Sequence, residues 1–146
     1  MSARHAVLLD TAVFIYAVGG EHRYREACRD LLDPTVLRRC GAEASVQAVQ
    51  EFLHQRARRT GDRQGAADLA EAMSRLCPLH DLTPHDLRVG LQLFRQHDRL
   101  TGRDALHAAT ALNRDIPAII SPDPDFDGID GLTRIDPLDA HERFAS

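Results

Sequence analysis

Four acidic residues stand where a carboxylate could do chemistry. Asp10 is the one charge in an otherwise apolar run over residues 6–16, and Glu51, Asp104 and Asp123 follow along the chain. A carboxylate at the end of a buried strand is costly unless something pairs with it or coordinates it. Carboxylate oxygens are the ligands that Mg²⁺ and Mn²⁺ prefer. The four acids together predict a metal site, and such a site favours phosphodiester hydrolysis.

The apolar spacing predicts alternating strands and helices that would position these acids. Strands are expected over 6–10, 41–45, 79–82, 118–121 and 132–136, and helices over 11–18, 22–33, 45–59, 62–77 and 102–113, with another beginning at Pro84. This alternation predicts a parallel sheet with helices on both faces. Ligands bind beyond the carboxyl ends of such strands, where Asp10 and Asp123 stand. The 146 residues, 43% of them hydrophobic, suit one compact domain over 1–146.

Two of the acids also have a purely structural interpretation at a helix start. Asp10 is a suitable N-cap for the helix that begins at Thr11. Thr101 and Asp104 have the spacing of a capping box, with Asp104 at the third helical position. A first-turn carboxylate also stays ionised more readily near the helix dipole, so capping and metal binding are compatible for Asp104.

Glu51 has the least distinctive position of the four. The predicted core stripe of its helix consists of Val46, Val49, Leu53 and Ala57. At 100° per residue Glu51 lies beside this stripe, on the flank that also carries Gln47, His54 and Arg58. A solvated helix face is therefore the alternative interpretation of Glu51.

The loop over 121–131 carries Asp123, Asp125 and Asp127. It superficially matches a calcium-binding EF-hand loop, but the twelfth position, which should be glutamate, is Arg134. A solvated turn rich in aspartate and proline is the alternative. The loop follows a predicted strand, which favours a functional role.

Composition excludes several classes of enzyme. The net charge is −4 and all 18 basic residues are arginine. Without lysine, a phosphate-binding P-loop and Schiff-base chemistry are both excluded. A haloacid-dehalogenase-type phosphatase also needs lysine, and it needs a second aspartate where this chain has Ala12.

Composition also bears on the compartment. The three cysteines, Cys28, Cys40 and Cys77, have no metal-ligand spacing and predict a reduced cytoplasmic protein. Asp10 interrupts the N-terminal apolar run, and no apolar stretch is long enough to span a membrane.

Other side chains could support the acids. Arg56, Arg58 and Arg59 cluster at the end of the Glu51 helix, where they could hold RNA phosphates or simply form a solvated helix end. His107 follows Asp104 by three residues and could face the same cleft, although an ordinary packed histidine is the alternative.

These motifs resemble the PIN-domain ribonucleases, most closely the VapC-type toxins of type II toxin–antitoxin pairs. The resemblance covers residues 6–136 and rests on four segments in family order. They are Leu8-Leu-Asp10-Thr11, Gln50-Glu51-Phe-Leu-His54, Asp104-Ala-Leu-His-Ala-Ala109 and Ser121-Pro-Asp123-Pro-Asp125-Phe126.

The resemblance implies a three-layer α/β/α sandwich around a mainly parallel sheet. It implies an endoribonuclease that depends on Mg²⁺ or Mn²⁺, forms a homodimer and is neutralised by a cognate antitoxin. Asp10, Glu51, Asp104 and Asp123 would be the catalytic metal ligands, with Thr11, Ser121 and Asp125 in support. Prolines flank Asp123, so Asp125 is the alternative fourth ligand. An RNA-processing nuclease of the same superfamily, or a binding module without cleavage, are the alternative functions.

Overall fold

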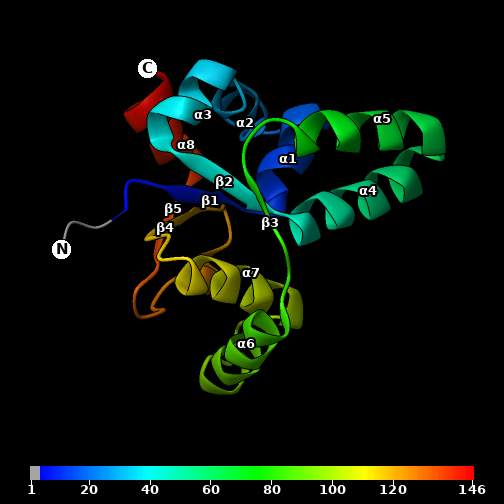
Figure 1. The fold of residues 1–146 in the computed structure, drawn as a ribbon. Helices are drawn as coiled ribbons and strands as arrows, with labels where there is room; N and C mark the ends of the chain where they lie inside the picture. The colour runs from blue at the N-terminus through cyan, green and yellow to red at the C-terminus, as the bar shows by residue number, and fades with distance from the viewer. Residues whose placement is uncertain (1–3) are drawn as a thin grey trace.

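The computed structural model describes residues 4–146 and contains a central sheet of five short strands (Figure 1). All the strand pairs are parallel, and the order is β3-β2-β1-β4-β5. The strands are β1 (Val7–Leu9), β2 (Ala42–Ser45), β3 (Leu79–His80), β4 (Ala118–Ile120) and β5 (Thr133–Ile135). The predicted parallel sheet is confirmed, and β1 lies at its centre.

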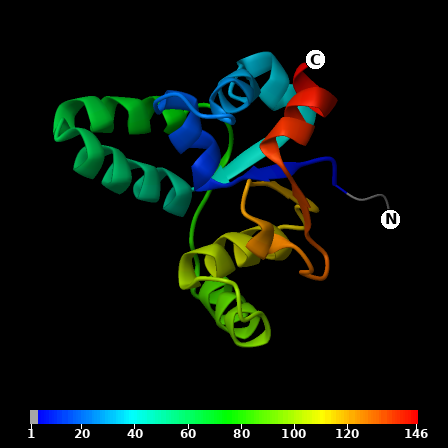
Figure 2. The ribbon, with the colours of Figure 1, turned by 180° about the vertical axis from the view of Figure 1, so that it is seen from behind.

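Helices cover both faces of the sheet and give the three-layer α/β/α arrangement (Figures 1 and 2). One face carries α1 (Thr11–Val18), α2 (Arg25–Leu31), α3 (Pro34–Cys40), α4 (Val46–Thr60), α5 (Arg63–Ser74) and α8 (Pro137–Ala140). The other carries α7 (Gly102–Asn113), with α6 (Pro84–Gln96) packed behind it.

The central strand β1 contributes side chains to two separate hydrophobic cores. Val7 and Leu9 face the layer that contains α1 to α4, whereas Leu8 faces the layer that contains α7. Successive side chains of a strand point to opposite faces, so a strand covered on both sides is apolar throughout. This explains why the β1 sequence shows no alternation of polar and apolar residues.

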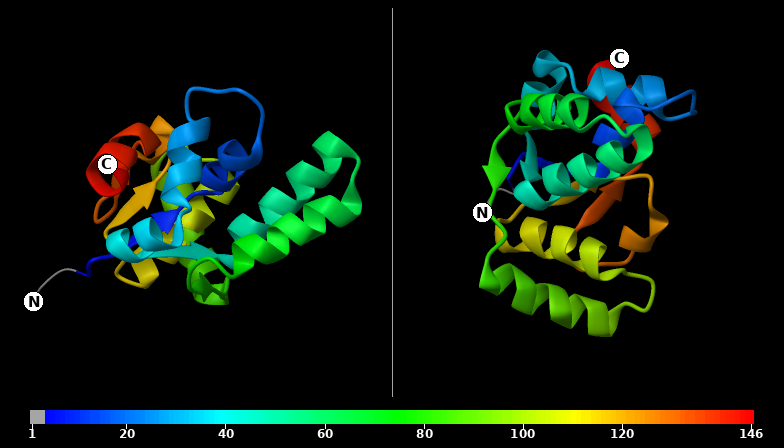
Figure 3. Two further views of the ribbon diagram at one scale, coloured as in Figure 1. Left: turned by 90° about the horizontal axis from the view of Figure 1, so that it is seen from above. Right: turned by 90° about the vertical axis from the view of Figure 1, so that its right-hand side faces the viewer.

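Helices α4 and α5 form a hairpin that projects away from the sheet (Figure 3). The predicted core stripe on α4 is wrong in part: Val46 and Leu53 are 46% and 37% exposed, and the buried residues are Ala48 and Phe52. The helix turns this other face to the core. Of the predicted stripe, Val49 still packs against the core, whereas Leu53 and Ala57 line the groove between α4 and α5.

Two further elements differ from the sequence prediction. Pro34 begins α3 instead of only following a helix, because Asp33 caps the new helix by accepting a hydrogen bond from the amide of Thr35. After β5 the chain continues as α8 and a π-helical turn over His141–Ala145, where no element was predicted. Within residues 4–146, no helix has both the length and the apolar character needed to cross a membrane.

Candidate active site

A cleft of about 990 Å³ opens beyond the carboxyl end of β1. Its walls come from α1, α4, the start of α7 and the loop after β4. All four predicted acids line it, as do Thr11, Arg58 and Arg59. The remaining lining residues are Ala12, Ile15, Gln50, His54, Gln55, Thr101 and Arg103. The fold therefore brings into one cleft four carboxylates that lie far apart in the sequence.

Asp10 is 6% exposed, and it serves both as the N-cap of α1 and as a carboxylate that lines the cleft. Its Oδ1 accepts the amide of Thr11 at 2.9 Å, which caps α1, and its Oδ2 accepts the hydroxyl of Ser121 at 2.7 Å. Burial raises the pKa of Asp10, while His107 and the Ser121 and Thr11 hydrogen bonds oppose the rise. Capping thus fixes the orientation of a carboxylate that also lines the cleft.

Asp104 lies in the first turn of α7, behind the N-cap Thr101, whose hydroxyl accepts the Asp104 amide at 3.1 Å. The return bond that would complete a capping box is not formed among the described residues, whereas Thr83 and Asp86 do form a complete box on α6. Burial first, and then the charges of Asp10 and Asp123, raise the pKa of Asp104 to about 6. The carboxylate therefore feels its acidic neighbours across the cleft.

Glu51 is held by three donors from three helices. Its Oε2 accepts the Thr11 hydroxyl at 2.8 Å and lies 3.2 Å from Nε2 of His107, and its Oε1 accepts Gln47 Nε2 at 3.0 Å. Burial alone would raise the pKa of Glu51, but His107, Thr11 and Gln47 lower it below its usual value. The side chain is therefore an ordered part of the cleft, and the solvated-face interpretation does not describe it.

The loop after β4 places its first aspartate at the cleft. Asp123 lines the cleft and its Oδ1 accepts the amide of Asp125 at 2.9 Å, which caps the 3₁₀ turn Pro124–Phe126. The Ser121 hydroxyl accepts the Asp123 amide at 3.1 Å. Asp125 is not among the lining residues of the cleft. Of the two candidates for a fourth acid, the loop geometry favours Asp123.

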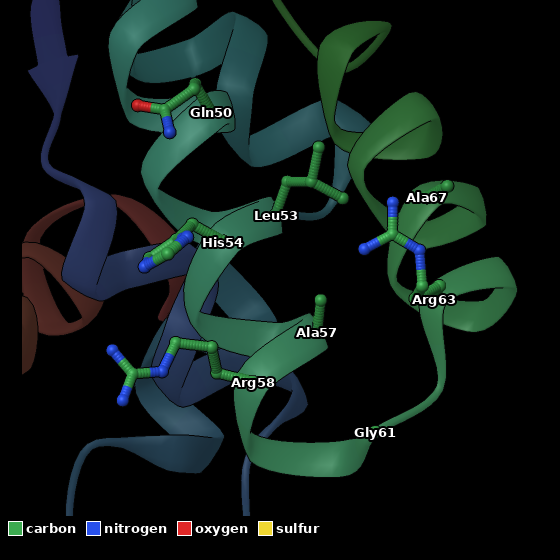
Figure 4. Close-up of a pocket in the computed structure, with 8 residues that line it drawn as sticks. All are labelled: Gln50, Leu53, His54, Ala57, Arg58, Gly61, Arg63 and Ala67. Atoms are coloured by element: carbon green, nitrogen blue, oxygen red, sulfur yellow. The ribbon is translucent and has the colours of Figure 1, made fainter.

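The predicted arginines separate into two kinds. Arg58 and Arg59 line the acidic cleft, whereas Arg56 donates from Nη1 to the carbonyl of Val18 at 3.2 Å and ties α4 to the end of α1. Figure 4 shows the adjoining groove between α4 and α5, where Leu53 and Arg63 face each other while Arg58 points away toward the cleft.

Sequence reasoning missed several residues of the cleft. Thr101 was seen only as a cap, and Arg103 was not considered, although it precedes Asp104 and lines the same wall. The role of Gln47 was also missed, and its spacing of four residues before Glu51 was the available signal. The flank of α4 that carries Glu51, His54 and Arg58 does line the cleft, as its spacing predicted, whereas the residues of α7 that share the cleft depend on how the two helices pack.

The donor set suits a hard divalent cation because it consists of carboxylate oxygens. Burial and the charges of Asp10 and Asp123 raise the pKa of Asp104, and a cation would offset this repulsion. Within residues 4–146, no three acidic, histidine or cysteine side chains already converge as a ready-made metal cage. Mg²⁺ usually keeps several water ligands and binds proteins through one or two carboxylates. An open acidic cleft leaves room for these water ligands, so it fits Mg²⁺.

Comparison with known proteins identifies the class. The PIN domain family model matches residues 7–132. A ribonuclease from Mycobacterium tuberculosis, VapC7, is 35% identical over 136 residues, which is 90% of this chain and 91% of that protein. The chain therefore belongs to the PIN-domain family, among the VapC-type ribonucleases of toxin–antitoxin systems.

Solved structures agree with this fold. The crystal structure of VapC20 from M. tuberculosis, described as a sarcin-ricin loop cleaving toxin, superposes with a TM-score of 0.68 at 18% identity and covers 82% of this chain and 92% of its own. A toxin–antitoxin complex from Klebsiella pneumoniae gives a TM-score of 0.64 at 19% identity and covers 90% and 97%.

Proposed function

We propose that this protein is a Mg²⁺- or Mn²⁺-dependent endoribonuclease, that it is the toxin of a toxin–antitoxin pair, and that Asp10, Glu51, Asp104 and Asp123 form its metal site. The observation that carries the proposal is the shared cleft, in which the charges of Asp10 and Asp123 help to raise the pKa of Asp104 to about 6. A cation would relieve this repulsion.

The chemistry follows from the donor set. The four acids would hold a divalent cation, which would supply an activated water and polarise the phosphate, so no side-chain nucleophile would be required. The protein itself would fix the acids: Ser121 and the Thr11 amide orient Asp10, while the Thr11 hydroxyl and Gln47 orient Glu51.

Basic side chains on two sides of the acids support RNA as the substrate. Arg58 and Arg59 approach from α4, and Arg103 approaches from the start of α7. An RNA strand that crosses the cleft would thus meet arginine from two of its walls. Phosphate contacts of this kind give affinity without sequence specificity.

The decisive experiment is cleavage of end-labelled single-stranded RNA, structured RNA and DNA by the purified protein. Cleavage of RNA should stop in excess EDTA and return with Mg²⁺ or Mn²⁺. Asp10→Asn and Asp104→Asn should each reduce it by at least about 100-fold, since the metal carries most of the catalysis. RNA cleavage that persists in EDTA would contradict the metal mechanism. RNA binding without cleavage by the wild type would favour a binding module.

Comparing Asp123→Asn with Asp125→Asn tests the fourth ligand. Asp123 lines the cleft and Asp125 does not, so the first variant should lose far more activity. The reverse order would move the ligand to Asp125.

Two partners complete the proposal. The structural similarity to a K. pneumoniae toxin–antitoxin complex supports a cognate antitoxin, which should restore growth when it is co-expressed with the active protein.

A homodimer is supported by α6, where Leu87, Leu91 and Phe94 are 48%, 44% and 50% exposed on one helix face. A two-fold dimer buries the same patch of both copies, so one such stripe serves both sides. The free cysteines Cys28, Cys40 and Cys77 suit a reducing cytoplasm.

A further inference from the structure

His107 is a buried polar side chain that contacts two residues lining the cleft, Glu51 and Thr11. It lies on α7, one turn after Asp104, and its side chain is fully buried. Its Nε2 lies 3.2 Å from the Glu51 carboxylate and 3.2 Å from the Thr11 hydroxyl. These partners are 56 and 96 positions away in the sequence and belong to α4 and α1. One ring nitrogen therefore links the three helices that form the cleft.

Burial of the second ring nitrogen, Nδ1, destabilises the folded state. Nδ1 of His107 is buried and has no hydrogen-bond partner among the described residues. A buried polar atom without a partner destabilises the folded state, so an apolar side chain would fill this position at lower cost. The contacts at Nε2 are the only polar ones that this imidazole makes in the described structure.

The contacts at Nε2 hold the acid that stands in the middle of a helix. Asp10 and Asp104 stand at helix starts, where the backbone limits them, whereas Glu51 lies in the middle of α4 with a longer side chain. Without His107, the Glu51 Oε2 would keep only the Thr11 hydroxyl, which itself would lose a partner. Fixing such a side chain in advance spares the entropy of ordering it when a cation binds.

We propose that His107 is a positioning residue, which holds the Glu51 carboxylate and the Thr11 hydroxyl in the orientation that the metal site requires. This inference rests on the proposed function, because it assigns Glu51 to that site. Partners that orient metal ligands typically change metal affinity by about 10- to 100-fold when they are removed.

The test is Mn²⁺ binding measured by calorimetry, independently of cleavage. His107→Leu removes the hydrogen bond, and His107→Gln keeps an N–H donor near the position of Nε2. We expect the Leu variant to bind Mn²⁺ about 10- to 100-fold more weakly and the Gln variant to recover most of this loss. Equal loss in both variants, or unchanged or tighter binding by the Leu variant, would overturn the proposal.

Thr110→Val is the matched control on the same helix. Thr110 is also fully buried, but among residues 4–146 its hydroxyl bonds only to the Leu106 carbonyl, at 2.8 Å, and makes no hydrogen bond to the acids. Its loss should leave Mn²⁺ affinity unchanged. A loss equal to that of His107→Leu would assign the effect to general repacking of α7 and overturn the proposal.

A double-mutant cycle with Glu51→Gln separates positioning from general damage. If His107 acts through Glu51, adding His107→Leu to Glu51→Gln should change Mn²⁺ affinity by less than about twofold. Additive losses would contradict the proposal. Wild-type protein that binds no Mn²⁺ would instead refute the metal site itself, and the role of His107 with it.

Discussion

Ser121 donates a 2.7 Å hydrogen bond from its hydroxyl to Oδ2 of Asp10, and both residues are buried. The bond joins the residues that follow β4 and β1, two neighbouring strands of the sheet. The same hydroxyl accepts the amide of Asp123. A single serine thus connects the acid after one strand with the acid in the loop after the next.

Replacing Ser121 with alanine should leave one oxygen of the buried Asp10 without its donor. We expect a loss of about 1–3 kcal/mol in the free energy of unfolding, measured by urea denaturation in EDTA. Ser74→Ala is the control, because within the described part of the chain that hydroxyl bonds only to the exposed carbonyl of Glu71, and its effect should stay within about 0.5 kcal/mol. Equal effects of the two substitutions would show that the Ser121–Asp10 bond is not important for stability.

The raised pKa of Asp104 makes the metal-free protein sensitive to pH. Its folded-state pKa is about 6, against 3.8 for the free side chain, so the folded protein binds this proton more tightly than the unfolded chain does. Stability should therefore fall as pH rises from about 4 to about 6. Asp104→Asn should reduce this slope and be more stable than wild type at pH 7 by about 1 kcal/mol, after allowance for partial exposure.

Thermal melts of both proteins between pH 4 and pH 7, with EDTA and with Mg²⁺, measure this effect. Mg²⁺ should stabilise the wild type more than the variant, because it binds the native carboxylates. Helix capping works in the opposite direction, since the charge near the start of α7 contributes about 0.3–1 kcal/mol. A variant less stable than wild type at pH 7 in EDTA would show that capping outweighs repulsion.

Arg58 and Arg59 should contribute to RNA affinity through phosphate contacts. In an Asp104→Asn background, which prevents cleavage, replacing both with alanine should lower the salt slope of single-stranded RNA binding by about 1.4, or 0.7 per contact. Arg88→Ala with Arg95→Ala is the matched control, because these arginines are exposed on α6 outside the cleft. Arg56→Ala should matter less for RNA, since Arg56 donates to the Val18 carbonyl. An unchanged slope would assign Arg58 and Arg59 to a solvated helix end.

Charge placed on the apolar stripe of α6 should prevent self-association. Leu91→Arg is expected to convert a dimer into a monomer, since an unpaired charge at the centre of the interface cannot be desolvated cheaply. Light scattering after size exclusion gives the mass directly. Leu138→Arg, at a similarly exposed leucine on α8, should leave the dimer intact. A dimer that survives Leu91→Arg would locate the interface elsewhere.

The sequence by itself determined the layout of the protein, because those signals are local. An apolar triplet followed by a polar residue located β1 with Asp10 and β4 with Ser121, and Thr101 marked the start of α7. Alternating strands and helices predicted the parallel sheet, and parallel strands place their carboxyl ends together. From that rule alone, Asp10 and Asp123 had to lie at the same edge.

Only the tertiary structure decided which helix faces meet the cleft. The periodicity of α4 permits more than one apolar face, and packing selected Ala48 and Phe52 for the core over Val46 and Leu53. With Ala48 and Phe52 packed on the core, Glu51 reaches the Thr11 hydroxyl and His107, which lies 56 positions further along the chain. No local pattern encodes a contact over such a separation, because it depends on how α1, α4 and α7 pack against the two faces of the sheet.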